Sequence, residues 1–160
     1  QSTKLVTHAH RSSARPDLLC AVPWGFRMAG DTPINPMPPV RGIVFFAHGS
    51  RDPLWSLPIA AVADALQQQR PDALCTCAYL ELTKPDLSTA CQQLIHQGCT
   101  TITVLPMFLG TGRHARNDLP ILVDALRHQH PDVRFDIATA VGEDPRVTEL
   151  LAQIAMQYIA

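Results

Sequence analysis

The chain has 160 residues, of which 46% are apolar and 17% are charged, and its formal net charge is −1. This length suits one ordinary domain with its own hydrophobic core. The near-zero charge gives no indication of a nucleic-acid or membrane-surface partner. No run of about 18 apolar residues predicts a membrane span, and the N-terminus lacks the basic-then-apolar pattern of a secretory signal.

Residues 1–40 differ in composition from the rest of the chain. They contain six of the fourteen prolines and show no sustained period of 2 or 3.6 residues. We therefore predict a poorly structured extension or linker here, followed by an α/β domain over 41–160. His8 and His10 lie in this extension, where we interpret them as incidental rather than as a metal site.

Four strands and four helices alternate after residue 40. Short apolar runs predict strands over 43–47, 74–81, 101–107 and 133–138, and apolar residues at helical spacing predict helices over 59–66, 87–95, 119–126 and 147–158. We expect Asn117 or Asp118 to cap the third helix, with Pro120 near its first turn, and Asp144 to cap the fourth. This alternation predicts an open, mostly parallel four-stranded sheet with helices on both faces.

The five cysteines do not have the spacing of a disulfide framework. An odd number without such spacing favours a reducing compartment, so we expect the protein to be cytoplasmic. Cys75 and Cys77 fall in the second predicted strand. We place them on opposite faces of that strand, as small core residues rather than a metal or redox pair.

Ligands of open parallel sheets bind at the carboxyl ends of the strands. The first strand ends in His48, the second in Glu81, and the third leads into the loop "FLGTGRHARND", which contains His114. Imidazole and carboxylate groups bind divalent metals, and histidine accepts protons near neutral pH. A single histidine after a strand is usually only a polar residue that reaches water, but three such groups on one edge favour a site.

Other known motifs fit this edge less well. "HGS" at residues 48–50 is similar to an oxyanion loop of α/β-hydrolases, but the sequence contains no GxSxG nucleophile elbow. It also contains no GxxxxGK[ST] phosphate loop, and "GTGRHA" at 110–115 is only a partial dinucleotide motif after the wrong strand. The glycines of that segment more plausibly give the loop the freedom to present His114.

Three segments together resemble the small class II tetrapyrrole chelatases, in particular the sirohydrochlorin cobaltochelatase and ferrochelatase group. They are "AHGSRDP", "YLELTKPDL" and "VLPMFLGTGRHARNDLP", which follow the first, second and third strands in order. The resemblance covers about residues 41–160. It implies ATP-independent insertion of a divalent metal ion into sirohydrochlorin or a related tetrapyrrole, with Co²⁺, Fe²⁺ or Ni²⁺ as a substrate and no permanently bound cofactor.

The resemblance also implies the roles of single residues. His48 and His114 would bind the incoming metal ion and, with Glu81, form the catalytic group, because insertion must remove two pyrrole N–H protons. Cations and small residues around them would bind the carboxylates on the rim of the macrocycle. This substrate-binding set is Ser50, Arg51, Lys84, Gly112, Arg113 and Arg116. For each of these cations, the alternative to substrate binding is that it is an ordinary solvated charge on the surface.

One alternative to the enzyme remains open, a non-catalytic protein of the same fold that binds the metal or the tetrapyrrole without turnover. Larger class II chelatases resemble two copies of this unit facing each other, and this chain contains one unit without an internal repeat. We therefore expect a homodimer whose two sheet edges enclose the macrocycle.

Overall fold

The structure, a computed structural model, describes residues 38–110 and 112–159, without the side chains of residues 113–115. These residues belong to one compact unit, Met37–Ala160. The predicted extension, apart from its last three residues, lies outside the described part of the chain, and so do His8, His10 and Cys20.

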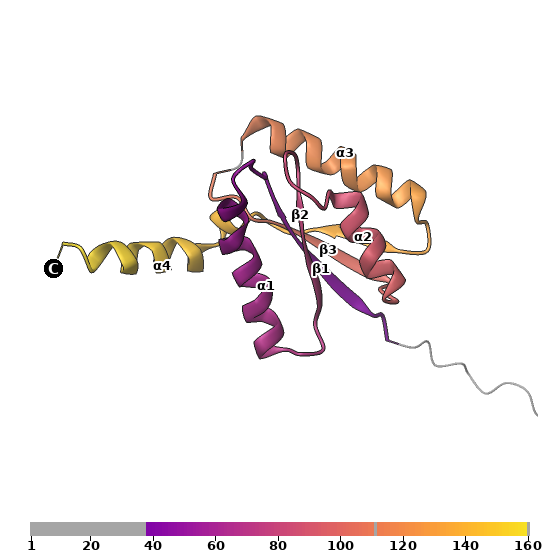
Figure 1. Ribbon diagram of the computed structural model, residues 1–160, viewed down its shortest axis with the longest axis horizontal. Helices are drawn as coiled ribbons and strands as arrows, with labels where there is room; N and C mark the ends of the chain where they lie inside the picture. The colour runs from indigo at the N-terminus through magenta and orange to yellow at the C-terminus, as the bar shows by residue number, and fades with distance from the viewer. Residues whose placement is uncertain (1–37, 111, 160) are drawn as a thin grey trace, which may run out of the picture. The chain divides into compact units, whose positions relative to one another are not determined.

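The centre of the domain is one parallel sheet of four strands (Figure 1). The strands are β1 (Arg41–Ala47), β2 (Leu74–Tyr79), β3 (Thr101–Pro106) and β4 (Arg134–Ile137), in the order β2-β1-β3-β4. Every neighbouring pair is parallel, and Phe46 is in register with both Ala78 and Pro106. The predicted open parallel sheet is confirmed, and all four carboxyl ends meet at one edge.

Helices lie on both faces of the sheet, as predicted. The helix α1 (Leu57–Gln69) follows a short 3₁₀ turn, η1 (Pro53–Ser56), and covers one face, whereas α2 (Leu87–His96) and α3 (Arg113–Gln129) cover the other (Figure 1). The chain passes from β1 to β2 in one direction across the sheet, and from β2 to β3 and β4 in the other. Because each crossover is right-handed, this reversal moves the next helices to the opposite face.

The hydrophobic core lies between the sheet and the pair α2 and α3. Val44 and Phe46 of β1 and Ile102 and Val104 of β3 are fully buried, and they alternate along their strands as residues facing one side must. Side chains from both helices pack against them: Leu87, Ala90, Cys91, Leu94, Leu119, Val123 and Leu126. This core fixes the strands, and through them the positions of the residues that follow each strand.

The first part of α3 differs from the prediction. The helix begins at Arg113 with Gly112 as N-cap, not at Leu119, and Asn117 and Asp118 are not its caps. Pro120 lies inside the helix and cannot donate to the carbonyl of Arg116. Both residues are exposed, so water can satisfy that carbonyl, which explains why the helix continues through the proline.

The fourth helix, α4 (Pro145–Met156), follows a second 3₁₀ turn, η2 (Val141–Glu143). The side chain of Asp144 accepts from the amide of Arg146 and caps the helix, as predicted. The guanidinium of Arg146 lowers the pKa of Asp144 to about 2, so this cap is ionised at neutral pH. The helix packs mainly on η2 and contains no buried residue.

Cys75 and Cys77 lie on one face of β2, not on opposite faces. The Sγ atoms of both approach carbonyl oxygens of α1, at 3.8 Å from Ala63 O and 3.9 Å from Ile59 O. Residues two apart in a strand point the same way, so the predicted opposite placement was wrong. Their interpretation as near-core residues agrees with their half-buried side chains.

Candidate active site

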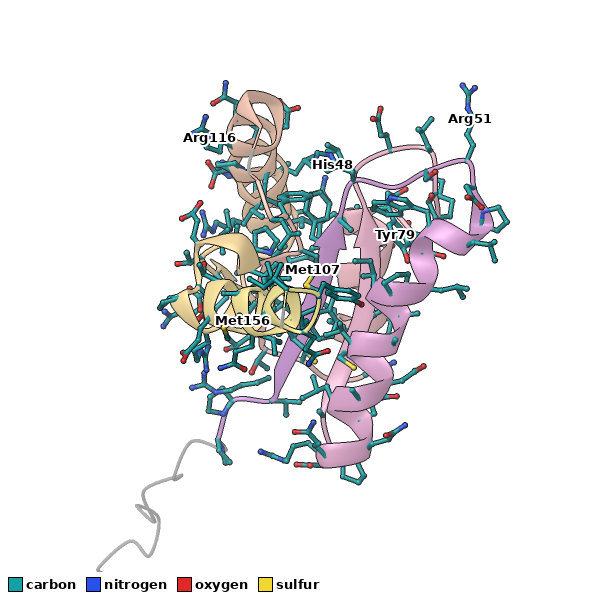
Figure 2. All side chains as sticks on the ribbon, turned by 90° about the vertical axis from the view of Figure 1, so that its left-hand side faces the viewer. His48, Arg51, Tyr79, Met107, Arg116 and Met156 are labelled. Carbon is teal, nitrogen blue, oxygen red and sulfur yellow. The ribbon has the colours of Figure 1, made fainter. Side chains whose placement is uncertain are left out.

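His48 lies at the carboxyl end of β1, directly after the buried Ala47. Its ring lies against Phe108, with ring centroids 4.4 Å apart, and Phe108 in turn packs edge-on against Phe46 at 6.1 Å. Phe108 is only 3% exposed, whereas His48 is exposed. The imidazole therefore rests on the hydrophobic core and faces outward. In Figure 2 it lies at the upper edge, between Arg116 and Arg51.

Glu81 is held beside His48 by an extension of the β1–β2 pairing. The amide of Leu80 donates to the carbonyl of Ala47 at 2.9 Å, and the amide of Glu81 donates to the carbonyl of His48 at 2.9 Å. These two bonds join the segments that follow β1 and β2. The backbone thus brings the predicted imidazole and carboxylate together, and the Glu81 side chain is exposed at the same edge.

Gly49 allows the two loops to approach this closely. Its φ is +95°, in the left-handed region, and a Cβ built there would lie 1.9 Å from the carbonyl oxygen of Glu81. Only glycine fits both the conformation and the space. The glycine after His48 is therefore required by the contact with the β2 loop.

Ser50 and Thr83 join the same two loops. The Thr83 hydroxyl accepts from the amide of Ser50 at 3.0 Å and donates to the carbonyl of Ser50 at 2.7 Å. The Ser50 hydroxyl accepts from the amide of Asp52 at 3.1 Å. Thr83 thus satisfies both backbone groups of Ser50, a role that the sequence did not reveal because Thr83 stands among several polar loop residues.

Replacing Thr83 by valine is expected to loosen this connection. The substitution keeps the shape of the side chain but removes both hydrogen bonds and leaves two half-buried backbone groups unpaired, which costs about 1–3 kcal/mol of stability. Chemical denaturation would measure the loss. Thr83→Ser, which keeps the hydroxyl, is the control, and equal stability of the two variants would contradict the assigned role.

Three of the cations predicted to bind substrate, Lys84, Arg51 and Arg116, have different surroundings. Lys84 Nζ lies 2.7 Å from Asp86 Oδ2, and this pairing lowers the pKa of Asp86, which also caps α2. Arg51 is exposed and extends away from the molecule in Figure 2. Arg116, in contrast, lines a cavity of about 290 Å³ next to Phe108. Of these three residues, Arg116 has the position best suited to a bound molecule.

This cavity also includes a residue that was left out of the predicted site. Glu143 of η2 lines it opposite α3, together with Pro106, Leu119, Ile137 and Thr139. Phe108 was overlooked as well, since an apolar residue after a strand is usually only part of the core. The sequence indicated Glu143 only through its place after the fourth strand.

The segment after β3 is a helix start and not an extended loop. Gly112 is the N-cap of α3, and the backbones of Arg113 and His114 form its first turn, so the prediction of His114 on a loop was wrong. The strand β3 pairs with β1, and the amide of Met107 donates to the carbonyl of Phe46 at 2.7 Å. The start of α3 therefore follows the strand adjacent to the one that holds His48.

The four described cysteines are free, two of them buried and two half-buried. Burial raises the thiol pKa of Cys75, Cys77 and Cys99, and that of Cys91 to about 12, so these four thiols are protonated at neutral pH. Among the described side chains, no three His, Cys, Asp or Glu residues gather into a closed metal site.

An open α/β unit with an imidazole and a carboxylate at its carboxyl edge has the architecture of a single-lobed class II chelatase. The model of the CbiX family matches residues 42–157. The chain belongs to the CbiX family.

Relatives and solved structures agree with this assignment. The sirohydrochlorin cobaltochelatase of Saccharolobus solfataricus is 30% identical over 118 residues, which cover 70% of this chain and 91% of that protein. The sirohydrochlorin ferrochelatase of Bacillus subtilis is 28% identical over 68% of this chain, but the match covers only 42% of that longer protein. The crystal structure of a cobalamin (vitamin B12) biosynthesis CbiX protein from Marinobacter aquaeolei has a TM-score of 0.66 and 29% identity, over 74% of this chain and 94% of that one.

No helix among the described residues has both the length and the apolar character needed to cross a membrane.

Proposed function

We propose that this protein is a sirohydrochlorin chelatase, which inserts a divalent metal ion into the macrocycle without ATP. The observation that carries the proposal is His48, seated on Phe108 and joined through its backbone to Glu81, in a chain of the CbiX family. Relatives that share most of this fold bear the names cobaltochelatase and ferrochelatase, which favours cobalt or iron as the metal substrate.

His48 and His114 are the proposed ligands of the incoming ion. Imidazole accepts Co²⁺, Fe²⁺ and Ni²⁺, so metal availability contributes to which of them enters. An open set of two imidazoles can capture the ion and still release it to four ring nitrogens. The rigid seat of His48 supports this role because the imidazole does not have to be ordered when the metal binds.

Glu81 is the proposed acceptor of the pyrrole protons. Insertion replaces two N–H protons of the macrocycle by the metal ion, so a base must lie beside the ring nitrogens. The exposure of Glu81 and the hydrogen bond between its backbone amide and the His48 carbonyl support this role. Protons can then leave to bulk water from the same edge of the sheet.

Replacing Glu81 by glutamine is expected to slow insertion by about 10²-fold, while the affinity for the metal alone changes little. Glutamine keeps the shape and the loop contact, which is made by the backbone, but it cannot accept a proton. Single-turnover absorbance would measure insertion, and titration with Co²⁺ would measure capture. Equal losses in the two measurements would instead indicate that Glu81 binds the metal directly.

The rim carboxylates of sirohydrochlorin are proposed to bind the cations at this edge. Arg116 has the strongest support because it lines the cavity beside Phe108. Gly112 and Arg113 begin the same helix and complete this side, and Ser50 and Arg51 are the proposed counterparts on the β1 loop. Lys84 would have to exchange its contact with Asp86 for a substrate carboxylate, so we expect it to contribute least.

The proposal includes a homodimer. One sheet edge covers only one side of a flat macrocycle, so two copies are proposed to face each other across it.

The proposal also includes a cytoplasmic location. The four free thiols among the described residues support a reducing compartment.

The test is an anaerobic absorbance assay with sirohydrochlorin and Co²⁺, Fe²⁺ or Ni²⁺ in turn, with His114→Ala as the inactive control. Protein-dependent conversion of the macrocycle spectrum, absent in the variant, is the expected result, and the rates rank the metals. A spectral shift without turnover for every metal would reject the enzyme and leave a binding protein. Full turnover by the variant would reject the assignment of His114.

A further inference from the structure

Leu82, directly after Glu81, has a strained backbone. Its φ is +62°, and among the described residues it is the only one other than glycine in the left-handed region. The amide of Thr83 donates to the carbonyl of Glu81 at 2.7 Å. Such a bond around a residue of positive φ is the pattern of a γ-turn of the rare, strained form. Leucine has no local preference for this conformation, so its presence here requires an explanation.

Both neighbours of Leu82 are anchored to the loop after β1. The amide of Glu81 donates to the carbonyl of His48, and the Thr83 hydroxyl is bonded to both backbone groups of Ser50. The turn therefore cannot relax without breaking one of these contacts. The side chain of Leu82 is nevertheless 57% exposed, and the hydrophobic core forms without it. The strained turn thus holds an apolar side chain in solvent beside Glu81.

Leu109 is a second exposed leucine with a fixed backbone at this edge. It follows Phe108, the residue against which His48 packs, and its side chain is 67% exposed. The amide of Gly142 donates to the carbonyl of Phe108 at 2.9 Å, and a Cβ on Gly142 would lie 2.1 Å from the carbonyl oxygen of Leu109. As at Gly49, the glycine permits a close approach of two backbone segments. The contact with η2 therefore sets the position of Leu109.

The two leucines follow the strands on either side of the one that leads to His48. Leu82 comes after β2 and Leu109 after β3, and both strands are neighbours of β1. Two strand spacings amount to about 10 Å. Single exposed leucines are common on protein surfaces. Here, however, two separate backbone constraints place apolar side chains on both sides of one imidazole, at the edge where Figure 2 shows His48.

We propose that Leu82 and Leu109 bind one face of the tetrapyrrole ring and hold it over His48. The inference rests on the proposed function and adds the apolar part of the substrate site. The other residues proposed to bind substrate are glycine or polar, and the cations among them reach the carboxylates on the rim. The flat ring inside this rim is apolar, and ligand sites are normally lined mostly by apolar side chains. Two leucines about 10 Å apart can contact opposite halves of the ring, with the imidazole between them facing the ring nitrogens.

This role accounts for the strained turn. Glycine or asparagine would adopt a φ of +62° more easily than leucine does, but neither offers an apolar side chain. Leucine at this position thus exchanges some stability of the free protein for contact with the ring. Because both leucine backbones are already fixed, little loop entropy is lost when the ring binds.

The test measures the binding of metal-free sirohydrochlorin to the full chain by absorbance titration. Leu82→Asn keeps the approximate size, suits the left-handed region and removes the apolar contact. We expect this variant to melt at or above the wild-type temperature and to bind the macrocycle about five- to tenfold more weakly. Leu82→Met, which stays apolar, should retain most of the affinity. Leu109→Asn should lose as much as Leu82→Asn, and the two losses should multiply in the double variant because the sites are well separated.

Leu57 and Ile121 provide matched controls. Leu57 is 57% exposed, as Leu82 is, and Ile121 is 66% exposed, close to the 67% of Leu109. They belong to α1 and α3, the helices on the faces of the sheet in Figure 1. Leu57→Asn and Ile121→Asn should therefore leave the affinity for the macrocycle unchanged. Titration with Co²⁺ alone should give the wild-type affinity for every variant, since leucine does not bind metal.

Several results would overturn the inference. They are a wild type that does not bind the macrocycle, wild-type affinity in Leu82→Asn and Leu109→Asn, equal losses in the controls, and a Leu82→Met protein as weak as Leu82→Asn. Weakened Co²⁺ binding by Leu82→Asn would also overturn it, because the turn would then act through the metal site. Metal insertion tests the chelatase separately. Binding through these leucines without insertion rejects the chelatase alone, and insertion with unchanged affinity in both leucine variants rejects this inference alone.

Discussion

Replacing His48 by alanine is expected to lower the rate of metal insertion by roughly 100-fold or more, with the fold retained. The imidazole is exposed, and within the described residues its side chain makes no hydrogen bond. Its removal therefore leaves no buried polar group unpaired and opens no core cavity. What is lost is the proposed metal ligand, which packs against Phe108 at the sheet edge.

The measurement is the anaerobic absorbance assay together with a thermal melt. His96→Ala is the matched control, because His96 is an exposed histidine in the last turn of α2, away from the carboxyl edge of the sheet. We expect the control to keep the wild-type rate and both variants to melt near the wild-type temperature. A His48→Ala protein with near-normal turnover would show that the metal is captured elsewhere.

Replacing Gly49 by alanine is expected to have the largest effect on both stability and turnover. The added Cβ would lie 1.9 Å from a backbone carbonyl oxygen, and a backbone cannot move aside as a flexible side chain can. To relieve the contact, the β1 loop must separate from the β2 loop, which would break the Glu81–His48 and Ser50–Thr83 hydrogen bonds. We expect a loss of roughly 4 kcal/mol or more, at the upper end of single substitutions.

Gly98→Ala separates the two causes of this effect. Gly98 has a similar φ of +91°, but nothing lies within 4 Å of its Cβ position. Its substitution should cost only the left-handed strain of a non-glycine residue, about 1 kcal/mol. Denaturation of both variants gives the difference, which is the cost of the loop contact. If the two losses are equal, the contact between Gly49 and Glu81 does not hold the site together.

The placement of two residues of the candidate site could be predicted from the sequence. His48 and Glu81 each follow an apolar run, and the rule that parallel strands end at one edge was sufficient to bring them together. The backbone bond between Glu81 and His48 then refined this prediction from a shared edge to a direct contact. Side chains such as Phe108 and Thr83 gave no such signal, because their roles depend on residues far away in the chain.

The start of α3 shows where local patterns fail. Asn117, Asp118 and Pro120 together read as a helix start, since each is favoured there. The helix nevertheless begins at Arg113 because Gly112 caps it and solvent tolerates an interior proline on an exposed face. Local propensity is a weak guide to a helix boundary, and the helix that packs Leu119, Val123 and Leu126 on the core extends back to Arg113 against it.

By itself, the sequence determined the parallel α/β architecture and the sheet edge at which His48 and Glu81 lie, because hydrophobic periodicity and strand direction are local properties of the chain. Only the tertiary structure decided which loops touch, which cation is already paired with Asp86, and that α4 leaves its own sheet. These features depend on distances between residues far apart in sequence, such as the close approach of Gly49 to the carbonyl oxygen of Glu81, which no local pattern of residues records.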